Sequence, residues 1–371
     1  MSLTIPVIRE PGFDHAPWFN GIIHGASVEA RRRGVVCRVR ECAADELPGL
    51  KFDDIESPIR PVILVGSSVA WLSNVKSLCA DVSLRPILAG NCMDEGIFFP
   101  ISTVSVNRSH AIMRLTGELY DSGRRNFALV GSLPDSFTDI HRRELFASVL
   151  KSFGLYREDA FYDQTDGLAE CLTRFGRDAE KYDTVFFTND IIALCFAPRA
   201  AAMGIAIPRD LVPVGFGNLP LSAAMLPQLI SFSLDFVQIG RASLKTALEL
   251  SRRPEQLSCK LELACGICRG SDVCISAASF DAEEMAYDDR EYGALCYIDR
   301  LFSAGDRLSL DILRGLNDGL TYSDIAERLF LSDSALRYRI KNIFSGLGAV
   351  SRADARRLTG RYLALGIHNL C

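Results

Sequence analysis

The sequence predicts an α/β protein built on parallel sheets, followed by a small all-α domain near its C-terminal end. Over about the first 275 residues, short apolar runs alternate with longer amphipathic stretches. From residue 309 onward, this pattern gives way to short helical segments separated by Gly, Ser and Thr. With 371 residues, of which 48% are hydrophobic, the chain is long enough for two or three packed units.

The apolar runs have the composition of buried parallel strands. They are rich in Val, Ile, Leu and Phe, and helical patterns such as that of 18–33 lie between them, as in βαβ units. Open sheets of this kind bind ligands beyond the carboxyl ends of their strands, so the loops after the runs are expected to hold a site. In chain order, the runs are TIPVIRE, VVCRVRE, PVILVG, RPILAG, NFALVGS, DTVFFTND and LVPVGFG.

Charge is unevenly distributed along the chain, whose net charge is −5. Residues 301–371 hold ten basic and seven acidic residues, so the remaining 31 basic and 39 acidic residues make the rest of the chain acidic. Residues 280–291 carry six acids against one Arg. We interpret 276–305 as an acidic linker with a short helix at 292–303, followed by a basic domain at 306–371.

The sequence favours a cytoplasmic protein without catalytic or metal chemistry. Its start, MSLTIPVIREPGF, lacks the features of a signal peptide, and no apolar run reaches the roughly 18 residues of a membrane helix. The twelve cysteines are scattered and suggest no disulfide framework. Cys265 and Cys268 are spaced as zinc ligands, but residues three apart on a strand face opposite sides. No nucleophile elbow or dinucleotide fingerprint is present, so neither an enzyme nor a cofactor is expected.

Four short helices are predicted in about the last 60 residues. Thr321, Ser332 and Ser351 stand where N-caps belong, and Gly319 and Gly348 stand where C-caps belong. At 100° per residue, the third helix has an apolar arc opposite a polar and basic one. The apolar arc comprises Leu336, Ile340, Ile343, Phe344 and Leu347, and the polar arc comprises Ser334, Tyr338, Lys341 and Ser345, with Arg337 and Arg339 at its edges.

The second and third of these helices have the pattern of a helix-turn-helix. A short turn, FLSD, joins the segment SDIAERL to the third helix, and the small Ala326 allows two helices to approach closely. In a helix-turn-helix, the second helix enters the DNA major groove. The basic arc of the third helix therefore predicts a DNA-reading surface.

Motifs along the first 270 residues resemble the effector-binding domain of the lactose/galactose-repressor family. This resemblance implies a two-lobed periplasmic-binding-protein-like sensor over 1–275, made of parallel sheets flanked by helices, with a ligand in a cleft that closes by hinge motion. The matching positions, in order, are 104–107, 123–125, Arg142 with Phe146, Asn189-Asp190 with Ala193, 204–210 and Gly215-Phe216.

In that family, the chain crosses between the two lobes three times. We expect the crossings here near 104–107, 231–235 and 254–259. Lobe one would then be about 1–105 and 235–256, and lobe two would be about 106–234 and 257–275.

By this resemblance, Arg142 and Asp190 would contact the ligand. A guanidinium donates to paired hydroxyls or to a carboxylate, and a carboxylate accepts from hydroxyls, so the pair suits a sugar or sugar derivative. Asp190 could instead cap the helix after it, Arg142 could be a solvated charge, and Trp18 could serve packing rather than stacking. The full candidate set is Arg142, Asp190, Asn189, Phe13, Asp14, His15, Trp18, Ser67, Ser68 and Asn218.

One departure from the family bears on the ligand. Where the family usually has an acid after GF, this chain has Gly217 and then Asn218. One hydroxyl-binding carboxylate is therefore missing, which puts a common sugar in doubt and leaves a small polar metabolite as the broader expectation.

The C-terminal helices resemble the LuxR-type helix-turn-helix family, although GDRLSLDIL replaces that family's opening motif. The resemblance implies DNA contacts from Ser332, Ser334, Arg337, Tyr338, Arg339 and Lys341. It also implies that the fourth helix pairs with its copy through Ala355, Leu358, Tyr362 and Leu365. The positions that follow the family spacing are Gly319, Asp324, Ile325, Ala326, Leu329, Leu331, Ser332, Ser334, Arg337, Ile340, Asn342, Ile343, Leu347, Ser351, Arg352 and Ala355.

Together these patterns predict a ligand-responsive, DNA-binding transcriptional regulator that acts as a homodimer. Its N-terminal sensor domain would be 1–275, and its C-terminal DNA-reading domain, the reader, would be 306–371. The alternative is a cytoplasmic small-molecule-binding protein that signals to a protein partner through its helical end without binding DNA. Salt dependence of DNA binding separates the two, because phosphate contacts release counterions.

Overall fold

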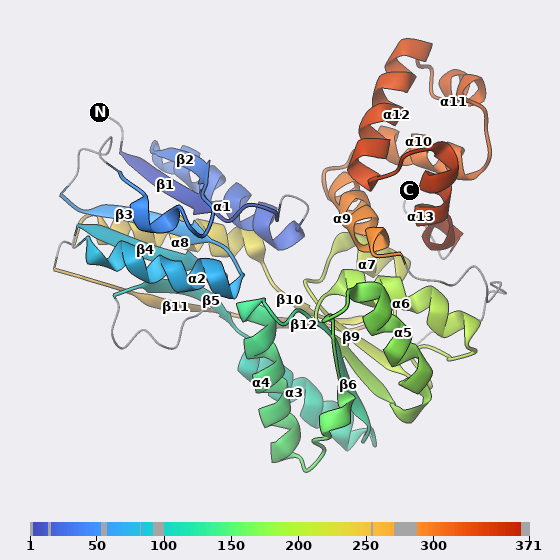
Figure 1. Ribbon diagram of the computed structural model, residues 1–371, viewed down its shortest axis with the longest axis horizontal. Helices are drawn as coiled ribbons and strands as arrows, with labels where there is room; N and C mark the ends of the chain where they lie inside the picture. Colours follow the sequence, from blue (N-terminus) through green and yellow to red (C-terminus); the bar gives the residue numbers. More distant parts are fainter. Residues whose placement is uncertain are drawn as a thin grey trace. The chain divides into compact units, whose positions relative to one another are not determined.

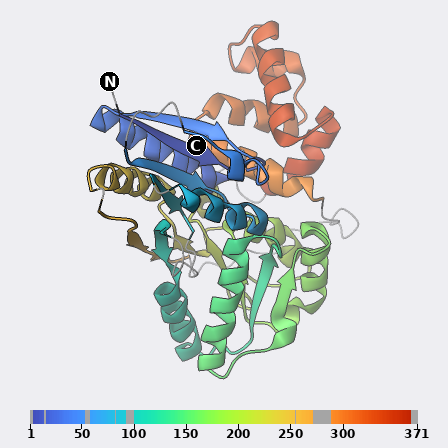
Figure 2. The same ribbon diagram turned by 60° about the vertical axis from the view of Figure 1, so that its left-hand side comes forward.

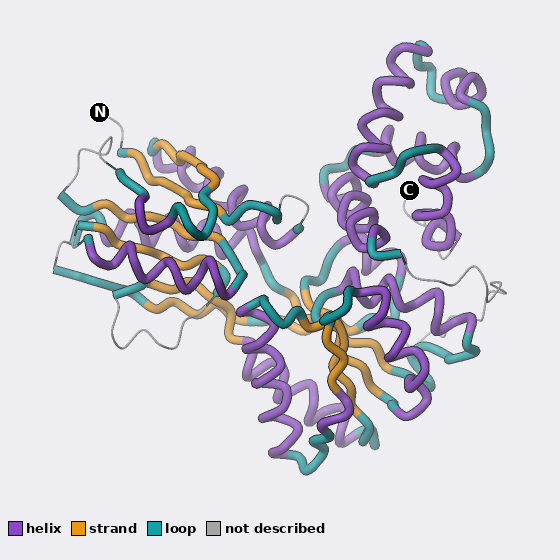
Figure 3. Tube along the Cα trace, viewed as in Figure 1, coloured by secondary structure: helices purple, strands orange, loops and turns teal. Residues whose placement is uncertain are grey.

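The computed structural model describes residues 3–13, 16–52, 58–81, 83–91, 100–253, 255–270 and 288–364. These residues form two six-stranded sheets flanked by helices and a C-terminal helical region (Figures 1 and 3), which confirms the predicted fold class. The chain divides into two compact units. Unit 1 comprises Met1–Leu115, Leu133–Phe146 and Leu234–Gly266, and unit 2 comprises Thr116–Ser132, Ala147–Ser233 and Ile267–Cys371.

The first sheet belongs to unit 1 and has the strand order β11-β5-β4-β3-β1-β2. All of its neighbouring strands run parallel. Its central strands are buried along their length, as continuous apolar runs should be in a sheet covered on both faces. The strands are β1 (Thr4–Arg9), β2 (Val36–Glu41), β3 (Arg60–Val65), β4 (Leu84–Ala89), β5 (Ser102–Asn107) and β11 (Lys260–Ala264).

Three helices cover this sheet. Helices α1 (Pro17–Arg33) and α8 (Phe236–Leu250) pack against each other on one face (Figure 2), and α2 (Val69–Val75) lies on the other. The α1–α8 contact is close because both helices carry glycine there. A Cβ atom on Gly25 would lie 2.0 Å from the Val237 carbonyl oxygen, and one on Gly240 would lie 1.9 Å from that of Ile22.

The second sheet belongs to unit 2, apart from the first residue of β12, and has the order β12-β10-β9-β8-β6-β7. Its core is rich in aromatic side chains; the rings of Phe175 and Phe196, for example, lie 4.9 Å apart. The strands are β6 (Phe127–Ser132), β7 (Phe161–Asp163), β8 (Thr184–Phe187), β9 (Val212–Phe216), β10 (Ile230–Ser233) and β12 (Gly266–Cys268). Helices α5 (Leu168–Asp178), α6 (Asp190–Ala202) and α7 (Pro220–Met225) belong to unit 2, whereas α3 (Arg108–Asp121) and α4 (Phe137–Ser152) begin in unit 1 and end in unit 2.

The chain passes from one sheet to the other three times, as expected, but the third passage lies later than predicted. Residues 260–264 form β11, which pairs with β5 at the edge of the first sheet, so the passage falls between Ala264 and Gly266. The expectation of 254–259 was wrong because β11 is an edge strand. Its alternation of exposed and half-buried residues would look the same at the edge of either sheet.

The C-terminal region contains α9 (Arg290–Ser303), α10 (Arg307–Asn317), α11 (Tyr322–Arg328), α12 (Asp333–Leu347) and α13 (Arg352–Ala364). The predicted helix at 292–303 is present as α9, whereas most of the acidic segment before it lies outside the described residues. α9 is more than a surface linker, since it contacts α6 and α7 on one side and α10, α12 and α13 on the other. Its apolar residues join both parts of unit 2 in one hydrophobic core.

The packing of α9 against α12 depends on one glycine. A Cβ atom on Gly346 would lie 2.1 Å from the Tyr297 ring. Within the described part of the chain, no helix is both long and apolar enough to cross a bilayer.

Candidate functional site

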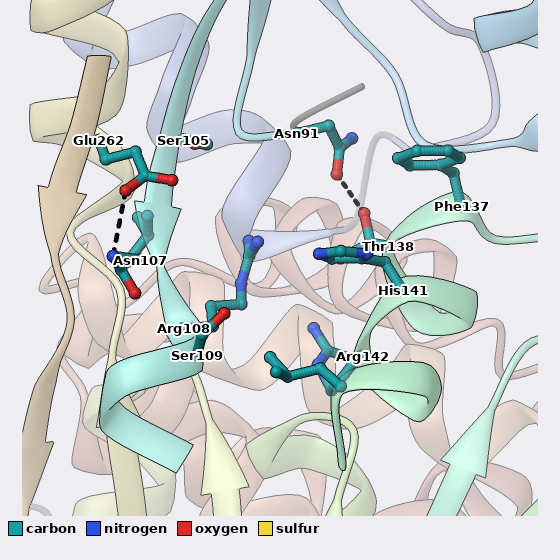
Figure 4. Close-up of a pocket in the computed structure, with 12 residues that line it drawn as sticks. Asn91, Ser105, Asn107, Arg108, Ser109, Phe137, Thr138, His141, Arg142 and Glu262 are labelled. Atoms are coloured by element: carbon teal, nitrogen blue, oxygen red, sulfur yellow. Dashed lines mark hydrogen bonds between the residues drawn. The ribbon is translucent and has the colours of Figure 1, made fainter. Parts of the chain in front are cut away.

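A pocket of about 200 Å³ lies in unit 1, beside the carboxyl ends of two parallel strands (Figure 4). Asn91 follows β4 and Asn107 ends β5, while the first turns of α4 provide Thr138, His141 and Arg142. This is the edge of a parallel sheet at which ligands are expected. The complete lining is Asn91, Ser105, Val106, Asn107, Arg108, Ser109, Phe137, Thr138, His141, Arg142, Leu145 and Glu262.

Arg142 reaches this pocket from α4 and is only 7% exposed. The alternative that it is a solvated surface charge is therefore wrong. Its Nη1 donates to Asp139 Oδ1 at 2.5 Å, and Asp139 Oδ2 accepts from the Leu133 backbone N–H at 3.1 Å. Burial raises the pKa of Asp139, whereas the Arg142 guanidinium opposes that rise. This pairing fixes the guanidinium at the pocket wall.

Both hydrogen-bond donors and acceptors line the pocket. Asn107 donates to the Glu262 carboxylate at 3.0 Å, and Arg108 donates to the Gly90 carbonyl at 3.2 Å. Figure 4 shows Arg108 and His141 on opposite sides of the space. Guanidinium donors together with a carboxylate acceptor suit a ligand rich in hydroxyl groups.

Ser67 and Ser68 lie behind this wall and serve the structure of unit 1. The buried Glu10 carboxylate accepts from the backbone N–H groups of Ser67 at 2.7 Å and Ser68 at 3.1 Å. The Ser67 hydroxyl lies 3.2 Å from that of Thr138, which in turn donates to Asn91. Neither serine lines the pocket, so the geometry favours an indirect role for both.

The predicted aromatic loop contributes to packing. Phe13 and Trp18 are half-buried, and Trp18 meets the buried ring of Phe19 edge to face at 5.3 Å. This geometry favours the packing interpretation of Trp18. Asp14 and His15 lie outside the described residues.

Asp190 is fully buried in unit 2, where its own chain occupies its carboxylate. Its Oδ2 accepts from the Leu219 N–H at 2.8 Å and the Ser222 hydroxyl at 2.9 Å, and its Oδ1 accepts from the Ser231 hydroxyl at 2.7 Å. Burial raises its pKa against these stabilising hydrogen bonds. The geometry favours a structural role, in which Asp190 ties the start of α6 to the loop after β9.

The neighbouring candidates in unit 2 also bond to their own chain. Asn189, not Asp190, caps α6, because its Oδ1 accepts from the Ile192 N–H at 3.0 Å. The Asn189 side chain also donates to the Tyr292 hydroxyl at 3.1 Å. Asn218 has a positive φ of 49° and donates its N–H to the Ser231 hydroxyl at 2.9 Å.

Helix α12 has the two faces predicted from the sequence. Leu336, Ile340, Ile343 and Leu347 are buried. The opposite face is exposed and includes Ser334, Arg337, Tyr338 and Lys341. The helix begins at a Ser332 cap, whose hydroxyl accepts from the Ala335 N–H, and ends at the left-handed Gly348.

Contacts within the chain bear on two other expectations about these helices: they favour a packing role for Arg339, whose DNA contact stays a prediction, and they contradict the exposed dimerisation face of α13. Arg339 turns toward the start of α10, where it donates to the Ser309 hydroxyl at 3.3 Å and lies 3.5 Å from Asp306. The α13 face expected to dimerise is buried by α9, α10 and α6 of the same chain. Leu358 and Tyr362 are fully buried there, since an apolar face on a helix can be covered by its own chain as well as by a partner. Leu365 lies outside the described residues.

Sequence reasoning missed most of the residues that line the pocket. The rule that ligands lie after strand ends pointed to the loops that hold Asn91 and Asn107, but not to particular side chains. His141 and Thr138 precede Arg142 by one and four positions, and only the helical geometry of α4 shows that all three share one wall. Glu262 was not predicted as a pocket residue, because 257–275 were expected to lie in lobe two, whereas β11 pairs with β5 in the first sheet.

Comparison with known proteins shows that the chain is similar to transcriptional regulators. Residues 116–271 match a family described as periplasmic binding protein-like domain. The HTH-type transcriptional repressor CytR of Escherichia coli K12 is 23% identical over 254 residues, covering 67% of this chain and 72% of CytR. Catabolite control protein A of Priestia megaterium is 27% identical over 151 residues, covering 39% of this chain and 45% of the relative. These curated relatives are regulators rather than enzymes, in line with the absence of catalytic motifs.

Solved structures share the fold. The lac repressor dimer bound to its operator and the anti-inducer ONPF has a TM-score of 0.61 at 15% identity, covering 73% of this chain and 93% of the repressor. A LacI-family regulator from Weissella paramesenteroides with bound sucrose has a TM-score of 0.58 at 18% identity, covering 73% and 98%. The two sheets therefore form a periplasmic-binding-protein-like domain whose relatives include repressors.

Proposed function

We propose that this chain is a cytoplasmic, ligand-responsive, DNA-binding transcriptional regulator that senses a small polar metabolite, a sugar or sugar derivative. The observation that carries the proposal is α12. It presents an exposed polar and basic face, and α9 packs it into one core with the second sheet. The second sheet and the proposed DNA-reading helix thus share one compact unit, unit 2.

The pocket in unit 1 supports the choice of effector. Arg142 and Arg108 supply donors, Glu262 supplies an acceptor, and Asn91 and Asn107 supply both. Related regulators of the same fold have been solved with sucrose and with glucose bound. We infer that the effector's hydroxyl groups bind between α4 and the ends of β4 and β5.

The reader would work as a LuxR-type helix-turn-helix. Ser334 and Arg337 lie in the first turns of α12, from which a recognition helix contacts base edges, and Lys341 would contact the phosphate backbone further along. A homodimer would place two such helices on paired half-sites. Arg339 also donates to the Ser309 hydroxyl of α10 at 3.3 Å, which favours a packing role for it beside any DNA contact.

Helix α9 offers a route from the sensor to the reader through three polar contacts. Asp289, which precedes α9, accepts from the Ala169 N–H at 2.9 Å, Tyr292 accepts from Asn189 at 3.1 Å, and Asp299 accepts from the Leu221 N–H at 3.2 Å. Asn189 caps α6, and Ala169 and Leu221 lie in the first turns of α5 and α7, so all three partners follow β7, β8 and β9 at the carboxyl edge of the second sheet. A ligand-dependent shift of these helix starts would move α9 and the helices packed on it.

DNA binding is tested by its salt dependence. We expect fluorescence anisotropy with genomic fragments to show affinity that falls steeply with salt, and Arg337→Ala or Lys341→Ala to weaken it about tenfold. If Lys341 contacts a phosphate, its loss lowers the salt slope by about 1. Arg209→Ala removes an exposed charge from the loop before β9 and serves as the control. Salt-independent or absent binding would instead favour the protein-partner alternative.

Effector binding is tested at Arg142. In thermal-shift titrations against a panel of sugars and sugar acids, Arg142→Gln is expected to weaken the stabilising effect of the active compound by about 10–100-fold, because a guanidinium–hydroxyl contact is lost in a buried site. Arg143→Gln, on the next position of α4, is the matched control. Stabilisation of the wild-type protein by apolar compounds only would contradict a polar effector.

A further inference from the structure

Phe330 has an unusual backbone conformation at the turn between α11 and α12. Its φ is +54°, in the left-handed region. Its N–H donates to the Glu327 carbonyl at 3.2 Å, and the next N–H, of Leu331, donates to the Ala326 carbonyl at 2.9 Å. This is the hydrogen-bond pattern of a Schellman motif, whose left-handed position is usually glycine, because a Cβ atom disfavours it. A bulky aromatic residue there is an outlier.

Nothing within the described chain compensates for this conformation by burying the ring. Phe330 is 96% exposed, the highest value among the exposed large apolar residues. Its neighbours Leu329 and Leu331 are half-buried and pack against the core, so the turn directs only the Phe330 side chain outward. Strain that brings no burial in the free protein is typical of positions that act on a partner.

The surroundings of Phe330 indicate the kind of partner. The exposed Arg328 ends α11, and the exposed Arg337 and Lys341 lie on the polar face of α12. Helix α12 begins at Asp333, three residues after Phe330, and its N-terminus adds the positive end of a helix dipole. Two exposed acids, Glu327 and Asp333, also flank the turn, so the charge near the ring is mixed. The basic face of α12 and the exposed ring together complement duplex DNA, which offers both phosphates and apolar sugar and methyl surface.

We propose that Phe330 is a DNA-contacting residue, whose ring packs against a deoxyribose or a thymine methyl group at the edge of the major groove that α12 enters. Such apolar contacts are made in this groove by small and aromatic side chains. The proposal rests on the proposed function. It adds an apolar contact, from the turn itself, to the polar contacts expected from α12.

The decisive variant is Phe330→Gly, because the proposal predicts opposite effects on folding and on binding. Glycine relieves the left-handed backbone, so the melting temperature is expected to rise by about 2–4 °C. The affinity for DNA is expected to fall about tenfold, while the salt slope stays unchanged, because an apolar contact releases no counterions. A residue with a merely structural role would not weaken binding while raising stability.

Two further variants complete the test. Phe330→Tyr keeps the ring and is expected to retain the wild-type affinity, whereas Val350→Ala removes another apolar side chain, 87% exposed, and is expected to change nothing. The inference is overturned if Phe330→Gly binds the same fragment as tightly as the wild type, or if it alters self-association in sedimentation and leaves DNA affinity intact. If the wild-type protein itself shows no salt-dependent DNA binding, the proposed function fails, a result distinct from the first two.

Discussion

Asp190→Ala is expected to lower the free energy of unfolding by about 3–5 kcal/mol, because it leaves several buried donors without an acceptor. The carboxylate is 0% exposed and accepts from the Leu219 N–H and from the hydroxyls of Ser222 and Ser231. The hydroxyls can rotate to other partners, but the N–H cannot. Urea unfolding followed by circular dichroism would measure the change.

Asp190→Asn and Asp166→Ala provide the controls for this experiment. The amide keeps the shape and one acceptor oxygen, so about half the loss is expected, while Asp166 is exposed and its replacement should cost less than about 0.5 kcal/mol. The same experiment separates the two roles considered for Asp190. If the alanine variant unfolds at the wild-type urea concentration but no longer responds to the effector, the carboxylate is a ligand contact and its structural assignment is wrong.

The sequence predicted the position of Asp190 but not its hydrogen-bond partners. The apolar strand before it shows that Asp190 follows the carboxyl end of β8, and the family motif implied a ligand contact. The serines that occupy its oxygens, however, lie 32 and 41 positions further along the chain. No local pattern connects them, because α7, which carries Ser222, and β10, which carries Ser231, approach α6 only in the folded protein.

Features with local causes were predicted well. Thr321 and Ser332 cap their helices and Gly348 ends α12, since each effect is produced within one turn of chain. The faces of α12 follow directly from its 3.6-residue period. What sequence could not predict depends on distant contacts, such as the glycine-mediated crossing of α1 and α8 or the internal burial of the α13 face.

Helix α9 shows the same limit with a functional consequence. The acidic segment before α9 and the short length of the helix suggested a linker, yet Ala294, Leu295 and Ile298 are completely buried. Periodicity indicates that a helix has an apolar face but not what covers it. Because α9 is covered by α6 and α7 and also by α10, α12 and α13, the position of the C-terminal helices depends on the packing of unit 2 rather than on a flexible tether.

The strength of this packing is expected to depend on pH through Asp299. This α9 residue is 2% exposed, and burial together with the nearby Asp190 raises its pKa to about 6, although the Leu221 N–H opposes the rise. In the unfolded chain, an aspartate titrates near 3.9. Below about pH 4, Asp299 is therefore protonated in both states and carries no penalty. Between about pH 4 and 6, the unfolded chain loses the proton first, so the folded state loses stability as pH rises.

Asp299→Asn is accordingly expected to stabilise the protein by about 2–3 kcal/mol at pH 7.5 and by little at pH 4, since a pKa difference of about two units corresponds to that free energy. The neutral amide resembles the protonated acid, so the variant should lack the loss of stability that the wild type shows over this interval. Urea unfolding at a series of pH values would measure both curves, with the exposed Asp318→Asn as control. Parallel curves for wild type and Asp299→Asn would mean that the pKa of Asp299 is the same in the folded and unfolded states. The packing of α9 would then carry no loss of folding free energy from a buried carboxylate at neutral pH.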